Sequence, residues 1–276
     1  MDIQKITDIG PWTGFVNDIN SDPAFSSPAL ATPAMMKDNL LSAVGRSGRE
    51  VLGVLRDGQP AGLFIPMLFP EDRYLEIDVA LSRSAEADEA MLRYLREQYP
   101  GFHADFVINP ADRLLTDLLV RSGARPDIEQ QVMKLTGDPP PVDTAGIEPL
   151  SEPFRDQYLA LHSTDCYWTG ERVAEAADRF RVLLAVEDGR VVGYLDVTKC
   201  FDENEPYDLL VEEASRRKGW GRKLLARAIE LNRPKAMELQ VDVDNLPALR
   251  LYGSMGFTRF PGRNNVTVKW DIPEKT

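Results

Sequence analysis

An internal repeat constrains this chain more than any other feature of its sequence. Residues 51–65 and 182–196 both consist of apolar runs around an Asp-Gly pair, and the two aspartates, Asp57 and Asp188, are 131 positions apart. Such a pair between apolar runs is a strong signal for a β-hairpin. Two further pairs of similar segments, each offset by 133 positions, are 74–79 with 207–211 and 118–124 with 251–257. The nearly constant offset predicts two copies of one α/β unit, with a period far too long for a solenoid.

Three consecutive prolines separate the two copies. Residues 137–143 read Gly-Asp-Pro-Pro-Pro-Val-Asp, and a proline run lacks amide donors and favours an extended connection. The chain of 276 residues is also longer than one compact domain usually needs. We therefore expect an N-terminal domain over 1–137, a linker over 138–144 and a C-terminal domain over 145–276.

Composition excludes several classes of protein. Hydrophobic residues make up 43% of the chain, which excludes a disordered or collagen-like chain. No window approaches the roughly 18 apolar residues of a membrane span. The first residues lack the pattern of a signal peptide, so we expect a cytoplasmic protein. The formal charge of −12 disfavours nucleic acid and membranes as partners and favours cationic ligands such as amines.

Cysteine and histidine form no recognisable motif. Cys166 and Cys200 are too few for a disulfide framework and are expected to be free thiols. No Cys/His motif surrounds Cys166, so a nucleophilic role for it has little support. His103 and His162 have no second ligand at metal spacing. We expect no metal, and expect each histidine to lie at the surface or in a satisfied core position.

Hydrophobic patterns predict the order of elements in the C-terminal copy. The expected elements besides the hairpin are a strand at 146–150, helices at 152–162 and 170–179, a strand at 208–211, a helix at 219–231, a strand at 237–241, a helix at 246–255 and a strand at 265–270. The helix at 219–231 has apolar positions suited to one buried face, and Pro234 ends it.

A basic loop with two glycines connects the strand at 208–211 to this helix. Gly219 and Gly221 let the backbone approach a ligand, and the free amides at a helix start bind anions. Residues 215–223 hold five basic residues and no acidic one. The pattern favours a pyrophosphate ligand; the alternative is a basic helix start exposed to water, which opposes the helix dipole. The loop is not a Walker loop, since no Gly-Lys-Ser/Thr follows, and it is not a dinucleotide-binding loop, since Leu224 replaces the third glycine.

Two signatures together resemble the GNAT acetyltransferase superfamily. The segment 211–221 is similar to the family's acyl-CoA loop, and 245–257 is similar to its second signature, Asn-x-x-Ala-x-x-x-Tyr followed by Gly-Phe. The resemblance spans about 145–272, and the N-terminal half resembles a degenerate copy. It implies an α/β (α+β) fold of two tandem GNAT-like domains. Each would be a mixed, mostly antiparallel sheet with splayed central parallel strands flanked by helices.

The resemblance also implies where acetyl-CoA, the co-substrate, would bind. Backbone groups of the strand would pair with the pantetheine arm, and amides of the loop would hold the pyrophosphate, with charge added by Arg216 and Lys218. The implied binding residues are Leu209, Leu210, Val211, Arg216, Arg217, Lys218, Gly219, Trp220, Gly221, Arg222, Asn245 and Tyr252. Asn245 also fits a plain helix cap, and both roles are compatible.

In this family the tyrosine of the second signature typically protonates the departing thiolate, which assigns that role to Tyr252; a lone tyrosine on a helix is otherwise more often a core residue. A strand amide near Leu210 would polarise the thioester carbonyl. No histidine looks well placed as the base that deprotonates the amine. The candidates are Glu205 and Asp208, followed by Glu212, and each is equally compatible with a solvated acid.

Tyr167 and Trp168 fall where the family forms its acceptor pocket, although they also fit ordinary core or rim aromatics. We expect an N-acetyltransferase that acts on a primary amine of a small molecule by direct transfer in a ternary complex, as a monomer or homodimer. A non-catalytic acyl-CoA sensor is an alternative, because no base is obvious. Acetylation of proteins is a third, and would need an open groove.

The N-terminal copy has lost the features of the loop. The residues at the 133 offset from Arg216, Gly219, Gly221, Asn245 and Tyr252 are Arg83, Glu86, Asp88, Asp112 and Leu119. Acids thus replace both glycines and face the place where a pyrophosphate would bind. We expect an inactive copy that packs against the active one and helps to shape its acceptor site.

Overall fold

The computed structural model describes residues 1–164 and 167–275, which form two compact units. The N-terminal unit consists of Met1–Gln131 together with Pro261–Thr276, and the C-terminal unit consists of Val132–Phe260. The chain therefore passes between the units twice. Within the described residues, no helix has the length and apolar character needed to cross a membrane.

The N-terminal unit is built on one seven-stranded sheet with the order β1-β2-β3-β4-β5-β15-β6. Its pairings are antiparallel except for the parallel pair β4–β5. The strands are β1 (Asp2–Lys5), β2 (Leu52–Arg56), β3 (Gln59–Phe69), β4 (Tyr74–Ser82), β5 (His103–Ile108), β6 (Arg125–Pro126) and β15 (Val266–Asp271). The helices are α1 (Thr13–Asn20), α2 (Pro33–Met36) continued by a π turn (Lys37–Leu41), α3 (Ala85–Gln98) and α4 (Arg113–Arg121).

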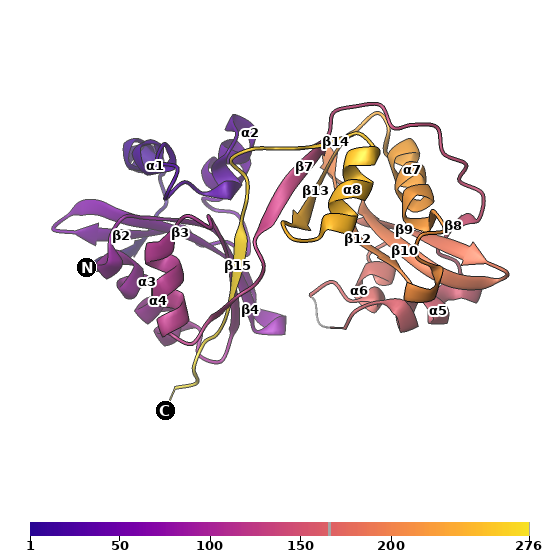
Figure 1. The fold of residues 1–276 in the computed structure, drawn as a ribbon. Helices are drawn as coiled ribbons and strands as arrows, with labels where there is room; N and C mark the ends of the chain where they lie inside the picture. The colour runs from indigo at the N-terminus through magenta and orange to yellow at the C-terminus, as the bar shows by residue number, and fades with distance from the viewer. Residues whose placement is uncertain (165–166, 276) are drawn as a thin grey trace. The chain divides into compact units, whose positions relative to one another are not determined.

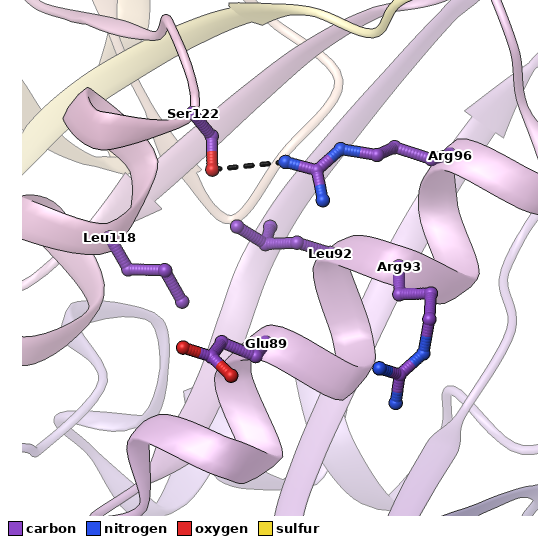
Figure 2. Close-up of a pocket in the computed structure, with 6 residues that line it drawn as sticks. All are labelled: Glu89, Leu92, Arg93, Arg96, Leu118 and Ser122. Atoms are coloured by element: carbon purple, nitrogen blue, oxygen red, sulfur yellow. Dashed lines mark hydrogen bonds between the residues drawn. The ribbon is translucent and has the colours of Figure 1, made fainter.

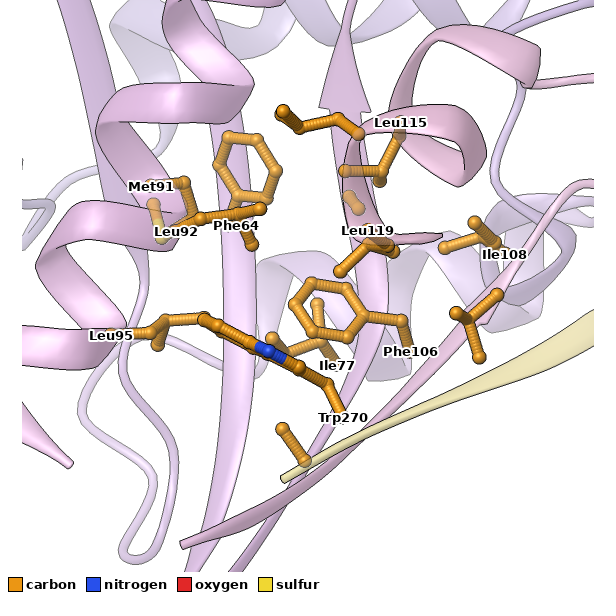
Figure 3. Packing of buried hydrophobic residues seen from close by; sticks show 14 of the residues in the cluster. Phe64, Ile77, Met91, Leu92, Leu95, Phe106, Ile108, Leu115, Leu119 and Trp270 are labelled. Carbon is orange, nitrogen blue, oxygen red and sulfur yellow. The ribbon is translucent and has the colours of Figure 1, made fainter. Parts of the chain in front are cut away.

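The last strand of the chain lies in the sheet of the N-terminal unit. β15 pairs antiparallel with β5, from Val266 opposite Ile108 to Asp271 opposite His103, and Figure 1 shows it in yellow among the earlier strands. Its Trp270 is 1% exposed and packs in the core of this unit (Figure 3). This corrects the expected boundary at 145–276: the strand forms where the sequence predicts it, but an alternating pattern does not specify which sheet a strand joins.

The C-terminal unit contains two four-stranded sheets, with the orders β12-β10-β9-β8 and β11-β13-β7-β14. Its strands are β7 (Gln130–Leu135), β8 (Ile147–Pro149), β9 (Phe180–Glu187), β10 (Arg190–Thr198), β11 (Glu203–Asn204), β12 (Pro206–Val211), β13 (Ala236–Asp242) and β14 (Phe257–Arg259). The helices are α5 (Arg155–Leu161), α6 (Gly170–Glu175), α7 (Trp220–Asn232) and α8 (Leu246–Ser254). The predicted helix at 170–179 thus ends four residues early, while the others lie close to their predicted ranges.

Both predicted hairpins form with the turn chemistry expected of Asp-Gly. Asp57 and Asp188 each have a φ of 51°, and the glycines that follow have φ values of 78° and 76°. Two successive residues with positive φ give the type I′ turn that matches the twist of the strands. The repeat is therefore present at the level of the backbone.

The strand that leads to the basic loop changes its partner at Pro206. Before it, β11 pairs in parallel with β13; after it, β12 pairs antiparallel with β10 in the other sheet. β12 is an edge strand of that sheet, so one side of its backbone is open. The N-terminal unit has the same arrangement, because β4 and β5 pair only along Tyr74–Ile77. The splayed parallel strands expected from the sequence are thus confirmed.

Two apolar clusters cover opposite faces of the β9-β10-β12 sheet. One contains Leu195 together with buried residues of α7, β13 and α8, including Tyr252, and Leu209 of β12 packs against it. The other contains Tyr194 and Tyr158, and Leu210 of β12 packs against it. Successive residues of a strand point to opposite faces, so β12 presents neighbouring side chains to two different environments.

Candidate active site

The basic loop enters α7 with the geometry of an anion-binding helix start. Arg217 (φ 64°) and Gly219 (φ 92°) adopt the left-handed conformation. A non-glycine residue held there is strained, and such strain concentrates at functional sites. The Lys223 amide makes the first intrahelical hydrogen bond, to Gly219 O at 3.0 Å, and no side chain caps the helix. The amides of 220–222 therefore remain available to an anion.

Gly221 lies between β12 and α8. A Cβ at this position would lie 3.3 Å from Leu251 Cδ2 and 3.7 Å from Leu209 Cδ2. The start of α7 is thus closely packed on two sides, and a glycine keeps its backbone accessible. The side chain of the preceding Trp220 turns elsewhere, since its ring lies against the backbone of Gly146. Trp220 can therefore offer its amide, but not its side chain, to an anion.

The basic side chains of the loop divide into two groups. Arg216 Nε donates to the backbone carbonyl at the end of β12 at 3.0 Å, and Lys218 Nζ forms an ion pair with Glu187 at 2.9 Å. Arg217 and Arg222 are exposed and form no ion pair within the part of the chain that the structure describes. Within the described residues, Arg216, Arg217 and Arg222 thus have no carboxylate partner, whereas the charge of Lys218 is paired with Glu187.

Only alternate residues of β12 turn their backbone groups to its open edge. Glu212 N donates to a β10 carbonyl at 2.9 Å, and Leu210 O lies so close to Gly193 of β10 that a Cβ there would be 2.6 Å from it. Because hydrogen-bonding direction alternates along an edge strand, Leu210 pairs with β10 while Leu209 and Val211 face outward. Of the three strand residues predicted to pair with pantetheine, two have their backbone groups on the open side.

Tyr252 is a buried residue of α8 whose pKa responds to the charges of Asp208 and Glu205. It is 8% exposed, and its ring lies 5.9 Å from that of Phe257. Burial, reinforced by the negative charges of Asp208 and Glu205, raises the pKa of Tyr252 to about 12. The phenol is therefore protonated at neutral pH and can donate a hydrogen bond.

A buried polar cluster surrounds Asp208 on the other face of the sheet. Asp208 lies directly across from Asp196 of β10, and Tyr194 Oη donates to Asp208 Oδ2 at 2.7 Å. His162 Nε2 lies 2.9 Å from Asp196 Oδ2 and 3.7 Å from Asp208 Oδ2. Tyr158 Oη donates to both carboxylate oxygens of Asp196 at 3.1 Å. Sequence reasoning missed this cluster.

A histidine, His162, thus lies 3.7 Å from Asp208, one of the two carboxylates considered as the base. His162 lies far from Asp208 in the chain, and the end of α5 brings it to the sheet. One sequence signal was available: Asp196 interrupts an otherwise apolar strand, and a buried acid needs a partner. One ring nitrogen of His162 and one carboxylate oxygen each of Asp196 and Asp208 lie within 4.8 Å of one another. Hydrogen bonds join His162 to Asp196 and Tyr194 to Asp208.

The aromatic residues predicted for the acceptor form a row that leads to Tyr207, the neighbour of Asp208. The Tyr167 and Trp168 rings are 5.5 Å apart, and the Trp168 ring lies 4.9 Å from that of Phe180. Phe180 in turn lies 5.8 Å from Tyr207, which directly precedes Asp208 and is 41% exposed. The row places apolar surface next to the carboxylates.

Several other predicted residues have structural roles. Asn245 Oδ1 accepts from the Ala248 amide at 3.2 Å, so it caps α8. Gly256 has a φ of 91° just after that helix. Cys200 is an exposed free thiol, as expected, whereas Cys166 lies outside the described residues.

At the equivalent helix start in the N-terminal unit, side chains of the protein itself take the place that an anion would need. Ser84 caps α3, with Oγ accepting from the Ala87 amide at 3.3 Å. Glu86, which replaces the first glycine, accepts hydrogen bonds from Ser84 Oγ and from Arg56, both at 2.8 Å. Arg83, at the position of Arg216, is drawn into an ion pair with an aspartate of α1 at 2.7 Å. This helix start offers no open place for a phosphate.

The N-terminal unit also has a surface hollow of ≈ 330 Å³ between α3 and α4. Figure 2 shows that Leu92 and Leu118 form its apolar part, and that Arg96 donates to Ser122 at 3.0 Å across it. Glu89 and Arg93 lie at its rim. None of the residues with predicted chemistry lines this hollow, so the candidate site is in the C-terminal unit.

Comparisons with known proteins agree with this location. Residues 147–257 match the model of the acetyltransferase (GNAT) family, and no curated protein matches the chain. A GCN5-related N-acetyltransferase from Sphaerobacter thermophilus has a similar fold, with a TM-score of 0.61 and 16% identity over 87% of this chain and 86% of that one. These identities are low enough that the likeness concerns the fold.

Two other solved structures resemble the whole chain. A tandem GNAT protein from the clavulanic acid biosynthesis pathway aligns with 100% of this chain and 99% of its own, at 14% identity and a TM-score of 0.53. A glucosamine N-acetyltransferase region of a fungal multi-domain β-N-acetylglucosaminidase aligns with 98% of this chain and 38% of its own, at 14% identity and a TM-score of 0.60.

Proposed function

Because this chain belongs to the GNAT acetyltransferase superfamily through its domain at residues 147–257, with a tandem fold, we propose that it transfers the acetyl group of acetyl-CoA to the primary amine of a small molecule. The transfer is direct, in a ternary complex at the open edge of β12. The N-terminal unit does not bind acetyl-CoA.

The observation that carries this proposal is that a carboxylate and a phenol lie on opposite faces of one edge strand. Asp208 points to the face that contains Tyr194. Its neighbour Leu209 points to the face that contains Tyr252. The charge of Asp208 nevertheless contributes to the raised pKa of Tyr252. A group at the open edge would thus have a proton acceptor on one side and a proton donor on the other, as acyl transfer from a thiol to an amine requires.

The residues present fit acetyl-CoA. The free amides of 220–222, the left-handed backbone at Arg217 and Gly219, and the unpaired Arg217 and Arg222 side chains suit a pyrophosphate. The outward backbone groups of Leu209 and Val211 suit the amides of pantetheine. Bound acetyl-CoA supplies an acetyl group activated as a thioester.

The residues of the chain then perform three tasks. Asp208 binds the incoming ammonium and accepts its proton, which leaves a neutral nucleophile. An outward amide of β12 donates a hydrogen bond to the carbonyl oxygen, as in an oxyanion hole. Tyr252, kept protonated by its raised pKa, donates to the departing sulfur.

Of the two carboxylates considered as the base, Asp208 is favoured over Glu205. Two groups, Tyr194 and His162, lie within 3.7 Å of the Asp208 carboxylate, and preorganised partners of this kind are typical of catalytic groups. Glu205 contributes negative charge that favours a cationic acceptor. The aromatic row ending at Tyr207 suits an amine that carries apolar surface.

Thiol release from acetyl-CoA across a panel of primary amines tests the proposal. The panel contains an alkylamine, an arylalkylamine, an amino sugar and a polyamine. We expect turnover with at least one, and a fall in kcat of about 10²-fold in Tyr252→Phe with little change in the KM for acetyl-CoA. Tyr74→Phe, which removes a buried phenol from the N-terminal unit, is the matched control and should leave kcat unchanged.

Two results would contradict the proposal. Binding of acetyl-CoA without turnover of any amine would favour the non-catalytic sensor. Full activity of Tyr252→Phe would remove the tyrosine from the mechanism. A peptide with a free lysine, added to the panel, separates a small-molecule acceptor from a protein one.

A further inference from the structure

A buried ion pair lies directly behind the carboxylate that we assign as the base. The side chains of His162 and Asp196 are 2% and 0% exposed, whereas that of Asp208 is 33% exposed. The imidazole thus lies between one carboxylate that is closed to solvent and one that reaches it. Burying charged groups costs free energy unless they are paired, so this arrangement calls for a role beyond core packing.

The hydrogen bonds of His162 determine where its protons lie. Nδ1 lies 2.9 Å from Ser163 O, which can only accept, so Nδ1 carries a hydrogen. Nε2 faces Asp196, and Tyr158 donates to both oxygens of that carboxylate. An ionised Asp196 accepts from Tyr158 and from a second hydrogen on Nε2, and this hydrogen makes the ring an imidazolium.

The surroundings of the ring favour this charge. The Tyr194 ring is stacked on it at 4.9 Å, with 16° between the planes, which places a cation over a π face. Burial by itself lowers the pKa of His162, but the hydrogen bonds to Asp196 and Ser163 O and the charges of Asp196 and Asp208 raise it by more. The titratable groups that interact with the ring or with Asp208 come from four elements: Tyr158 of α5, Glu171 of α6, Tyr194 and Asp196 of β10, and Tyr252 of α8.

We propose that His162, held as an imidazolium by Asp196, is a positioning residue that keeps Asp208 as a carboxylate directed at the acceptor ammonium. The proposal rests on the proposed function, because it assigns Asp208 as the base. The ammonium gives one proton to Asp208, which becomes a carboxylic acid, and the neutral amine keeps its lone pair. His162 and Asp196 retain their protonation throughout. With one imidazolium and two carboxylates, the cluster carries one net negative charge, which a single ammonium neutralises.

Proton NMR of the full chain tests the charge of the pair without reference to activity. The chain contains two histidines, so His103→Gln assigns both imidazole signals. We expect His162 to titrate above the ordinary value of about 6.5, and its midpoint to fall by at least about one pH unit in Asp196→Asn, with His103 unmoved. The samples contain EDTA, so that no metal competes. A wild-type midpoint at or below about 6.5 would overturn the proposal even if Asp196→Asn did not fold.

The pH dependence of kcat/KM, measured with the most active amine of the panel, tests the positioning role. Loss of a positive charge 3.7 Å from Asp208 makes its carboxylate easier to protonate. In His162→Gln the acid limb should therefore move to higher pH by about one unit, a roughly tenfold loss of kcat/KM on that limb. His103→Gln should leave the profile unchanged.

The outcomes of the two experiments are distinguishable. An unmoved acid limb in His162→Gln, with turnover intact, would overturn the positioning role and leave the proposed function standing. Absence of turnover with every amine would overturn the proposed function and the role of His162 together. The NMR titration would still decide the charge of the pair.

Discussion

The indole N–H of Trp270 donates to Ser122 O at 3.1 Å, across 148 positions of the chain. This bond ties the last strand, β15, to the end of α4 in the N-terminal unit. Trp270 also lies beneath the guanidinium of Arg96, 5.1 Å from its ring centroid. The C-terminal segment is thus a core element of the unit formed by the beginning of the chain.

We predict that a fragment of residues 1–137 does not fold stably by itself. Its sheet would end at β5 with an exposed edge, and the site of Trp270 would be empty. Adding a peptide of residues 261–276 should restore protection of β5 amides, measured by hydrogen exchange. The same peptide with Trp270→Ala should fail, since truncating a buried tryptophan costs about 3–5 kcal/mol. A well-folded 1–137 fragment would contradict the prediction.

Gly256→Ala should destabilise the C-terminal unit. Gly256 has a φ of 91°, and an added Cβ would lie 2.7 Å from Gly137 O. The strained conformation and the backbone contact together should cost about 2–3 kcal/mol in the free energy of urea unfolding. Gly253→Ala is the matched control, because a Cβ there meets nothing within 4 Å, and it should be neutral or stabilising. Equal changes in the free energy of unfolding for Gly256→Ala and Gly253→Ala would contradict the prediction.

Asp88→Asn should stabilise the N-terminal unit at high pH. Asp88 is 1% exposed, and within the described chain neither of its carboxyl oxygens has a hydrogen-bond partner. Burial, with a contribution from the charge of Asp112, raises the pKa of Asp88 to about 8. The folded pKa exceeds the unfolded value of about 3.9, so wild-type stability declines as pH rises from about 4 to 8.

The asparagine removes that dependence, since it does not ionise. The variant should therefore gain on the order of 2–4 kcal/mol over wild type between pH 5 and pH 8, measured by urea unfolding at both values. Glu89→Gln makes the same change in net charge at an exposed neighbour and should show no such gain. A stability difference that does not vary with pH would refute the assignment.

Gly221→Glu should weaken binding of acetyl-CoA. The new carboxylate would lie at the start of α7, where the pyrophosphate is placed, while the nearest atom to its Cβ belongs to the flexible Leu251 side chain at 3.3 Å. Calorimetry should show at least a tenfold rise in Kd, about 1.4 kcal/mol. Gly14→Glu, at a helical glycine of α1 with open space around it, is the control. Unchanged affinity in Gly221→Glu would mean that the pyrophosphate binds elsewhere.

Local features of the fold were predictable from the sequence because they depend on neighbouring residues. Asn245 and Asp112, at equivalent positions of the repeat, both cap helices, accepting backbone amides at 3.2 and 3.0 Å. The Asp-Gly turns and the glycine-rich start of α7 follow from the conformational preferences of single residues. Because the offset between the copies is nearly constant, the elements predicted in one copy also indicated the elements of the other.

Features that depend on distant pairing were not predictable in the same way. A strand with alternating apolar residues suits the sheet of either unit. The pairing of β15 with β5 therefore could not be predicted from the sequence. His162 meets Asp196 and Asp208 only through the packing of α5 on the sheet. The direction of the Leu210 backbone depends on strand register, which no composition pattern specifies.

The position of β15 bears on how this protein is made. Synthesis proceeds from the N-terminus, and domains generally fold as units as they leave the ribosome. Here the first unit lacks β15 until residues 266–271 have been translated, after the whole of the C-terminal unit. The C-terminal unit, complete at Phe260, is free to finish folding first. During synthesis the edge of β5 therefore stays unpaired until β15 arrives, and an unpaired edge can pair with strands of other chains.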